Sequence, residues 1–214
     1  MSTNILDKLA EYGVIPVIAI ESVDHALGLA DALIEGGLPV AEITFRTDAA
    51  ADVISLLADK RGELILGAGT VLTPENLQKA KDCGATFAVA PGFNPDVVKK
   101  ARDIDLPFVP GINNPTDIEM ALSLGCKALK FFPAEASGGI KYLNAISAPY
   151  KHTGVKFIPT GGINANNLSS YLELPIILAC GGTWIAKNED IVAGNWSEIT
   201  RRCKEVAKVV SNLK

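Results

Sequence analysis

Residues 64–92 read LILGAGTVLTPENLQKAKDCGATFAVAPG, in which two strand-length apolar runs, LILGAGT and FAVAPG, flank a helical pattern. Thr73 stands directly before Pro74, so its side chain can cap a helix whose first residue needs no N–H group. Gly84 follows the last periodic residue, where a helix favours a left-handed cap. A strand, a crossover helix and a second strand in this order predict a βαβ unit with parallel strands.

The same unit repeats along the chain, because eight apolar runs are each followed by a helical pattern and start 20 to 28 residues apart. This rhythm predicts a single α/β domain over residues 1–214, a closed (β/α)8 TIM barrel with an extra N-terminal helix at residues 3–12. A doubly wound open sheet is the alternative. The other six runs occupy residues 14–20, 40–46, 107–112, 128–135, 156–163 and 176–185. Further helix starts are predicted at Ser22, Thr47 and Asn94, and further helix ends at Gly36 and Gly125.

The composition of the 214 residues excludes several classes of protein, since 48% are apolar, 21% are charged and the formal net charge is −4. The apolar content excludes a disordered chain, and the charges form no basic stripe for nucleic acid. No stretch of about 18 apolar residues is present to cross a membrane. The charged residues near the N-terminus are atypical of a secretory signal. We therefore expect a cytoplasmic protein that binds neither nucleic acid nor membranes.

The cysteine and histidine residues form no metal-binding pattern. The four cysteines lack zinc-type spacing, so we expect reduced thiols. Neither of the two histidines lies near a second plausible ligand in the sequence. The sequence predicts chemistry that needs no metal and no other cofactor.

Charged residues interrupt two of the predicted strands. In the run at 40–46, Glu42, Thr44 and Arg46 have one parity, so their side chains leave the same face. Active sites of barrels lie at the carboxyl ends of the strands, which makes these residues candidates. A structural ion pair with a neighbouring strand is the alternative.

Lys130 interrupts the apolar run ALKFFPAE, residues 128–135. Burying an ammonium without compensation is costly, so either the charge is paired or the proton is held less tightly. A buried lysine whose pKa falls to about 7–8 supplies a neutral nucleophilic amine near physiological pH. The run predicts such an amine at Lys130, and a structural salt bridge from Lys130 to Glu42 is the alternative.

Glycine-rich turns end three other runs. GAGT (67–70) lets a ligand approach the backbone and ends in the Thr70 hydroxyl, but Leu72 breaks the pattern of a dinucleotide site. TGGI (160–163) and CGGT (180–183) close the seventh and eighth runs, where barrels often bind a phosphate. The two glycine pairs, together with Lys130, favour a phosphorylated carbonyl substrate and amine catalysis.

At these residues the sequence resembles the family of 2-keto-3-deoxy-6-phosphogluconate (KDPG) aldolases, which are often also active on 4-hydroxy-2-oxoglutarate (KHG). The resemblance implies a metal-independent class I aldolase with a barrel fold, commonly a homotrimer, which acts through a Schiff base. It also implies sugar-acid breakdown in the Entner–Doudoroff route, with pyruvate and glyceraldehyde 3-phosphate as products. The resemblance extends over about residues 12–208, and its most specific motifs are EITFRT (42–47), GAGTVLTPENL (67–77), APGFNP (90–95), LKFFPAEASGG (129–139), PTGGI (159–163) and CGGTW (180–184).

The resemblance implies a role for each matching residue. Lys130 corresponds to the Schiff-base lysine and Glu42 to the general acid/base, while Arg46 and Thr70 match residues that hold the pyruvate carboxylate. The substrate-lining residues are Pro91, Phe132 and Thr160, and the phosphate-binding residues are Gly161, Gly162, Gly182 and Thr183. Two positions depart from the pattern, because Thr183 stands where serine is expected and Phe45 where an aliphatic residue is expected.

Two other functions fit part of these observations. An aldolase acting chiefly on unphosphorylated KHG would keep the imine chemistry. A non-catalytic sensor of phosphorylated sugar acids would explain the glycine turns and Arg46, but it gives no reason for a lysine inside ALKFFPAE. The expected partner is a small keto-acid phosphate, which serves as substrate.

Overall fold

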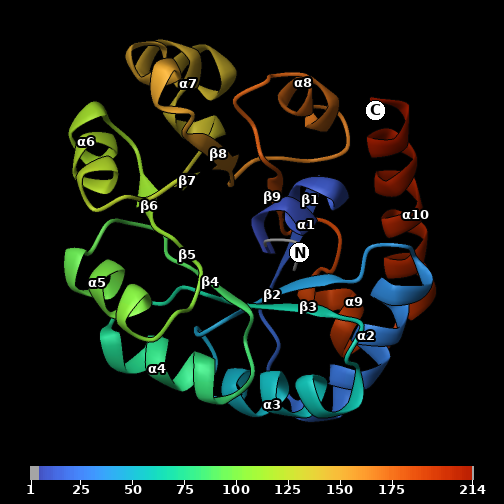
Figure 1. Ribbon diagram of the computed structural model, residues 1–214. Helices are drawn as coiled ribbons and strands as arrows, with labels where there is room; N and C mark the ends of the chain where they lie inside the picture. Colours follow the sequence, from blue (N-terminus) through green and yellow to red (C-terminus); the bar gives the residue numbers. More distant parts are fainter. Residues whose placement is uncertain (1–4, 214) are drawn as a thin grey trace.

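The computed structural model describes residues 5–213, in which strands and helices alternate along the chain. Figure 1 shows the strands near the centre, with α2 to α8 and α10 around the outside. No helix in the described range is both long and apolar enough to cross a membrane. The strands are β1 (Val14–Ile18), β2 (Val40–Thr44), β3 (Ile65–Gly69), β4 (Phe87–Val89), β5 (Phe108–Val109), β6 (Gly111–Ile112), β7 (Ala128–Phe131), β8 (Lys156–Pro159) and β9 (Cys180–Gly182). The helices are α1 (Ile5–Tyr12), α2 (Ala26–Glu35), α3 (Ala50–Lys60), α4 (Pro74–Asp82), α5 (Pro95–Asp103), α6 (Pro115–Ser123), α7 (Gly139–Ser147), α8 (Leu168–Leu172), α9 (Asn188–Val192) and α10 (Trp196–Asn212), with 3₁₀ turns η1 (Val23–His25), η2 (Glu135–Ser137) and η3 (Ala148–Thr153).

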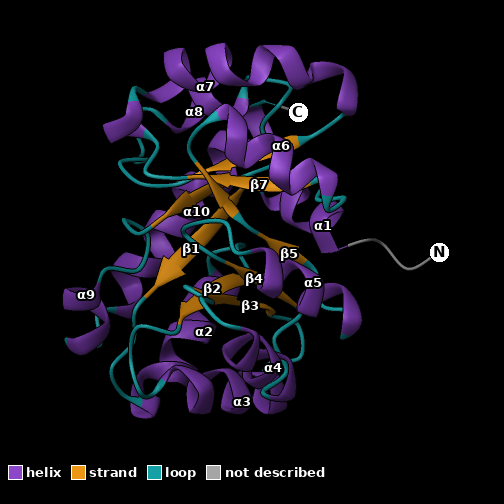
Figure 2. Cartoon of the chain, turned by 90° about the vertical axis from the view of Figure 1, so that its left-hand side faces the viewer, coloured by secondary structure: helices purple, strands orange, loops and turns teal. Residues whose placement is uncertain are grey.

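The strand pairs are parallel and form two ladders in the described part of the chain. In order of hydrogen bonding, one ladder is β5-β4-β3-β2-β1-β9 and the other is β6-β7-β8. Helices connect successive strands on the outside, as the side view in Figure 2 also shows. The predicted α/β class with parallel strands is confirmed, whereas the expected single ladder of eight strands is divided into two.

Two local features divide the ladder. Pro110 has no N–H group to donate, and it separates β5 from β6 within the run predicted at 107–112. The Pro110 carbonyl still accepts a hydrogen bond from the Lys130 backbone N–H at 2.8 Å. Between the last two runs, β8 and β9 are connected by isolated bridges, one of which joins Thr160 to Gly181. The strand contacts are therefore weakest at these two places.

Side chains alternate along the strands and build two apolar clusters. The outer cluster joins the strands to the surrounding helices and includes Leu129 of β7. The inner cluster includes the first residues of β2 and β7, Val40 and Ala128. Glu42 and Lys130 follow these two residues at a spacing of two, so they share the inner face of the strands.

Helix α1 covers the inner cluster. Leu9 of α1 is fully buried in it, and Ile5, Leu6 and Tyr12 pack against the same cluster. Because the inner cluster includes the first residues of β2, β4 and β7, α1 lies toward the N-terminal ends of these strands. Glu42 and Lys130 lie further toward the carboxyl ends. The structure places the predicted N-terminal helix at Ile5–Tyr12, while residues 3 and 4 lie outside the described range.

The helix starts predicted at Thr73 and Asn94 are confirmed. Each side chain accepts a hydrogen bond from a backbone N–H of the first turn, and each precedes a proline at the first helical position. Thr47 was predicted to cap the next helix, but α3 begins at Ala50. The Thr47 hydroxyl instead donates to the Ile20 carbonyl at 2.7 Å, which ties the end of β2 to the segment after β1.

The predicted glycine caps are confirmed at Gly84 and Gly125, which have φ values of 97° and 73°. The prediction for Gly36 is wrong by one residue, because Gly36 has a φ of −73° and Gly37 has a φ of 76°. Ser22 caps the 3₁₀ turn η1, and α2 follows this turn. Local capping signals thus locate the helix ends to within a few residues.

Candidate active site

Strands β2 and β7 bring two oppositely charged side chains into contact. Lys130 Nζ lies 3.2 Å from Glu42 Oε1, and the side chains are 7% and 3% exposed. The residues are 88 positions apart in the chain, so this contact depends on the strands folding around the inner cluster. The structure therefore confirms that Lys130 is buried beside Glu42.

The contact between Lys130 and Glu42 is expected both in a catalytic pair and in a structural salt bridge. The two alternatives differ in how many hydrogen-bond acceptors surround the Lys130 ammonium. A structural ammonium in the interior needs acceptors for all three of its protons. Among residues 5–213, Glu42 is the only side chain that accepts a hydrogen bond from Lys130 Nζ, and the Phe132 ring centroid lies 5.9 Å away. The remaining N–H groups can bind a substrate, which favours the catalytic pair.

Arg46 lies just after the end of β2, and a hydrogen bond fixes one nitrogen of its guanidinium. Its Nε donates to Thr44 Oγ1 at 3.2 Å, and the Thr44 hydroxyl donates to the Ile18 carbonyl at 3.0 Å. No carboxylate of the described residues pairs with Arg46. The two terminal nitrogens are thus available for a two-pronged contact with a substrate carboxylate. The sequence placed Thr44 on this face but did not indicate that Thr44 positions Arg46.

The Glu42 side chain packs closely against β3. A Cβ atom on Gly69 would overlap the Glu42 carboxylate, so a glycine is required at this position. The next residue, Thr70, has a φ of 56°, which is unfavourable for a β-branched side chain. Strained backbone of this kind is common at ligand-binding sites, which agrees with the ligand contact expected of Thr70.

Phe132 connects the charged pair to the first glycine pair. Its ring lies near Lys130 Nζ, and a Cβ atom on Gly161 would be 3.4 Å from the same ring. Gly161 and Gly162 have φ values of 98° and 84°. This left-handed backbone is readily adopted by glycine alone, and it exposes backbone N–H groups that can bind an anion.

The second glycine pair lies beside the first. Thr160 is 4% exposed and bridges to Gly181, which brings the ends of β8 and β9 together. A Cβ atom on Gly182 would overlap the Trp184 ring, so the indole packs directly against the glycine backbone. Thr183 lies between these residues and is exposed. No sequence pattern assigned a role to Trp184, although its position two residues after a strand-end glycine is a usable signal.

Pro91 lies on the side of the site formed by β4 and β6. A Cβ atom on Gly111 would overlap the Pro91 backbone, and Gly111 is the register partner of Lys130. Gly111 therefore lies between the Pro91 backbone on one side and Lys130 of the neighbouring strand on the other. This placement agrees with a residue that lines the site.

Glu135 adds a carboxylate next to the first glycine pair, a feature that the sequence did not predict. Its Cβ atom would lie 2.5 Å from a Cβ atom on Gly162, and its carboxylate accepts a hydrogen bond from the Tyr171 hydroxyl. Burial and this contact with Glu135 raise the pKa of the Tyr171 phenol. The phenol therefore remains a donor at neutral pH and fixes the Glu135 carboxylate.

The donor groups of the site suit amine chemistry. Within residues 5–213, no group of three or more histidine, cysteine, aspartate or glutamate residues is arranged to hold a metal ion. The site combines one amine, two carboxylates, one guanidinium, hydroxyls and glycine N–H groups. Such a set can form an imine with a ketone and can bind an anion at each end of the substrate.

Comparison with known proteins identifies close relatives over most of the chain. The family model described as "Aldolase: KDPG and KHG aldolase" matches residues 5–202. A 2-dehydro-3-deoxy-phosphogluconate aldolase of Haemophilus influenzae is 48% identical over 207 residues, which are 97% of each chain. The KHG/KDPG aldolase of Escherichia coli K12 is 40% identical over 195 residues, which are 91% of each chain.

A solved structure has nearly the same fold. The KDPG aldolase from Legionella pneumophila was crystallised with pyruvate captured at low pH as a covalent carbinolamine intermediate. It matches the present structure with a TM-score of 0.90 and 40% sequence identity, over 94% of this chain and 97% of that one. The match to the family model, over residues 5–202, includes the strands that carry the charged pair.

Proposed function

Because this chain belongs to the KDPG and KHG aldolase family, we propose that it cleaves KDPG to pyruvate and glyceraldehyde 3-phosphate as a class I aldolase. The observation that carries this proposal is the buried contact between Lys130 and Glu42. Relatives that are 40% to 48% identical are aldolases of this kind. The covalent pyruvate adduct of the Legionella protein supports catalysis through a Schiff base.

The reaction starts with the neutral Lys130 amine, which attacks C2 of the keto acid. The resulting carbinolamine loses water and becomes a protonated imine. When the C3–C4 bond breaks, its electron pair moves into the imine and leaves an enamine on C3, while C4 becomes the aldehyde carbon of glyceraldehyde 3-phosphate. Protonation of C3 and hydrolysis of the imine release pyruvate and restore the amine.

Glu42 is the proton carrier in this scheme. Its carboxylate lies 3.2 Å from Lys130 Nζ, which is within the distance for direct proton transfer. It accepts a proton from the Lys130 ammonium, which produces the neutral amine before attack, and a proton from the C4 hydroxyl during cleavage, either directly or through one water molecule. It returns protons when water leaves the carbinolamine and when the enamine is protonated.

Two groups of residues hold the ends of the substrate in this proposal. Arg46 and Thr70 bind the carboxylate next to C2, while Pro91, Phe132 and Thr160 line the space between the ends. The phosphate binds to the backbone of Gly161, Gly162 and Gly182 and to the Thr183 hydroxyl. The left-handed backbone at the first glycine pair supports this orientation, as does the Arg46 guanidinium, which pairs with no carboxylate among residues 5–213.

Two substitutions of Thr70 separate the contribution of its hydroxyl to substrate binding from the effect of its strained backbone on stability. Thr70→Ala and Thr70→Gly both remove the hydroxyl, so both are expected to raise KM for the keto acid about tenfold, equivalent to one lost hydrogen bond of about 1.4 kcal/mol. Glycine also relieves the strain at a φ of 56°, so Thr70→Gly should be more stable than Thr70→Ala by about 1 kcal/mol. Urea unfolding and steady-state kinetics measure the two effects. Equal stability of the variants would contradict the strain, and an unchanged KM would contradict the contact.

The choice of substrate separates the proposed activity from its closest alternative. The wild-type protein is expected to cleave KDPG with a higher kcat/KM than KHG, because only KDPG carries a phosphate for the glycine pairs. Coupled assays of pyruvate formation with each substrate measure this ratio. A higher kcat/KM for KHG would favour an aldolase for unphosphorylated keto acids, and binding of KDPG without turnover would favour a sensor.

The remaining proposals concern the whole protein. We infer one domain over residues 1–214, in which β5 and β6 act as one strand interrupted at Pro110. The two ladders then meet in a closed (β/α)8 barrel, with α1 as an additional helix, and the Thr160–Gly181 bridge supports this closure. By analogy with its family, we propose a homotrimer that acts in the cytoplasm on a small keto-acid phosphate.

A further inference from the structure

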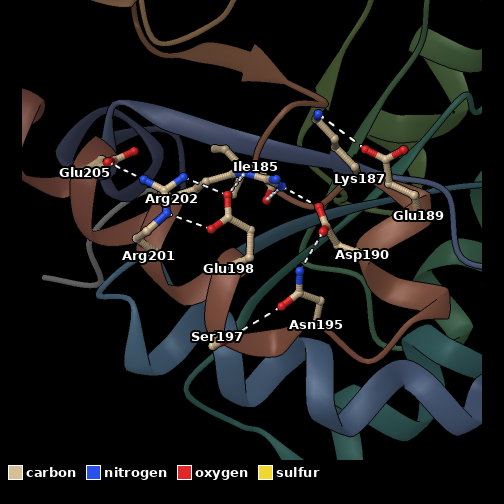
Figure 3. Close-up of polar contacts among 10 residues, drawn as sticks. All are labelled: Ile185, Lys187, Glu189, Asp190, Asn195, Ser197, Glu198, Arg201, Arg202 and Glu205. Atoms are coloured by element: carbon tan, nitrogen blue, oxygen red, sulfur yellow. Dashed lines mark hydrogen bonds and ion pairs between the residues drawn. The ribbon is translucent and has the colours of Figure 1, made fainter.

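A buried arginine connects the C-terminal helix to the segment that follows β9 (Figure 3). Arg202 of α10 donates from Nη1 to the Ile185 carbonyl at 3.3 Å and to Asp190 Oδ2 at 2.6 Å. Its Nε lies 3.0 Å from Glu198 Oε1 on the same helix. The side chains of Arg202 and Asp190 are 14% and 11% exposed. The guanidinium is therefore largely buried and contacts three separate oxygens.

Asp190 is held from a second side. Its other carboxylate oxygen accepts a hydrogen bond from Asn195 Nδ2 at 3.0 Å, and its backbone carbonyl accepts one from the Asn195 N–H at 2.8 Å. Arg202 and Asn195 thus fix helix α9 and the residues before it against the start of α10. These contacts involve none of the residues assigned to the substrate above.

A buried ion pair contributes little net stability, because the cost of removing both charges from water offsets their attraction. Its main effect is to fix geometry, since a charge-assisted hydrogen bond is short and directional. The geometry fixed here belongs to the segment after β9. Ile185 lies two residues after Thr183 and three after Gly182, the residues proposed to hold the phosphate.

We propose that Arg202 is a positioning residue for the phosphate end of the substrate, acting through the Ile185 carbonyl and Asp190 on the segment that carries Gly182 and Thr183. This inference rests on the proposed function. Without the guanidinium, the segment keeps its contact with Asn195 but loses the hydrogen bonds that Arg202 donates to Ile185 and Asp190, and the phosphate contacts become less well ordered. Binding of the phosphate should weaken, while the imine chemistry of Lys130, which Arg202 does not contact, continues.

The neighbouring residue provides a matched control. Arg201 pairs with Glu198 and Glu205 on its own helix, and its side chain is 53% exposed. It lines a surface groove of about 580 Å³ between α2 and α10. Figure 3 shows Arg201 directed away from Ile185 and Asp190. Arg201→Met therefore removes a guanidinium from the same helix without releasing the segment after β9.

The test compares Arg202→Met, Arg202→Lys and Arg201→Met with the wild-type protein on KDPG and KHG. For Arg202→Met we expect KM for KDPG to rise about tenfold, with less than a twofold change in KM for KHG and in kcat for either substrate. Arg202→Lys should recover part of the loss, because lysine keeps the charge but reaches fewer oxygens. Arg201→Met should behave like the wild type. If Arg202→Met does not fold, KM and kcat of Arg202→Lys and Asp190→Asn are compared with those of the wild type in the same way.

Calorimetric titration with inorganic phosphate completes the test without relying on catalysis. We expect the Kd for phosphate to rise about tenfold in Arg202→Met and to stay unchanged in Arg201→Met. Equal changes in KM for both substrates, or an unchanged phosphate affinity in Arg202→Met, would overturn the positioning role. A wild-type protein that binds phosphate but does not cleave KDPG would instead contradict the proposed function.

Discussion

Replacing Lys130 by alanine is expected to lower kcat for KDPG roughly 10⁶-fold, the scale observed when a protease loses its covalent nucleophile. Lys130 is the only basic residue of β7, and its Nζ lies 3.2 Å from Glu42 on the inner face of the strands. Without the amine there is no imine to accept the electrons of the C3–C4 bond. Binding of phosphate at the glycine pairs should remain, because those groups lie on other strands. Steady-state kinetics and phosphate titration of the same preparation measure both properties.

Lys130→Ala is also expected to be less stable, so a second variant must show that its loss of activity does not follow from unfolding. Removing one partner of a buried ion pair costs about 3–5 kcal/mol, because the other charge is left in the interior. The double variant Lys130→Met with Glu42→Gln removes both charges and should unfold at a urea concentration close to that of the wild type. It should still be inactive. Substantial activity in either variant would show that Lys130 is not the nucleophile.

Glu42→Gln is expected to reduce kcat by about 10²–10⁴-fold, the usual contribution of a general acid/base. The amide keeps the size of the side chain beside Gly69, where the space is tight, but it cannot carry protons. Pyruvate should still bind and should still form an adduct with Lys130, although more slowly. Single-turnover kinetics separate the slower chemical step from binding.

The surface pair of Glu35 and Lys204 provides a matched control for this variant. It has the same N–O distance of 3.2 Å, but its side chains are 59% to 71% exposed. Surface pairs contribute about 0–1 kcal/mol and take no part in the chemistry. Glu35→Gln should therefore leave kcat and KM unchanged. A Glu42→Gln variant with the kinetics of Glu35→Gln would contradict the proton-transfer role.

Much of the site was predictable because strand parity is a strict rule. Glu42 and Arg46 have the same parity in one predicted strand, at residues 40–46, and Lys130 interrupts the apolar run of another. These patterns placed the amine and the carboxylate on the inner face before their contact was known. The motifs that resemble the KDPG aldolases then favoured a catalytic pair over a structural salt bridge.

The sequence could not predict features that depend on contacts between distant segments. The division of the ladder follows partly from Pro110, which is visible in the sequence, and partly from the sparse pairing of β8 with β9, which no local pattern reveals. Thr47 has the residue type of a helix cap, but its hydroxyl is used by the Ile20 carbonyl. Arg202 resembles any charged residue of an amphipathic helix until the fold brings it to Asp190.

Reductive trapping tests the central claim most directly. The wild-type protein is incubated with pyruvate and sodium borohydride, which reduces an imine to a stable secondary amine, and the modified peptide is identified by mass spectrometry. We expect one pyruvate-derived adduct, located on Lys130, and a loss of activity in proportion to its formation. An adduct on another lysine, or no adduct in a preparation that cleaves KDPG, would contradict imine formation at Lys130.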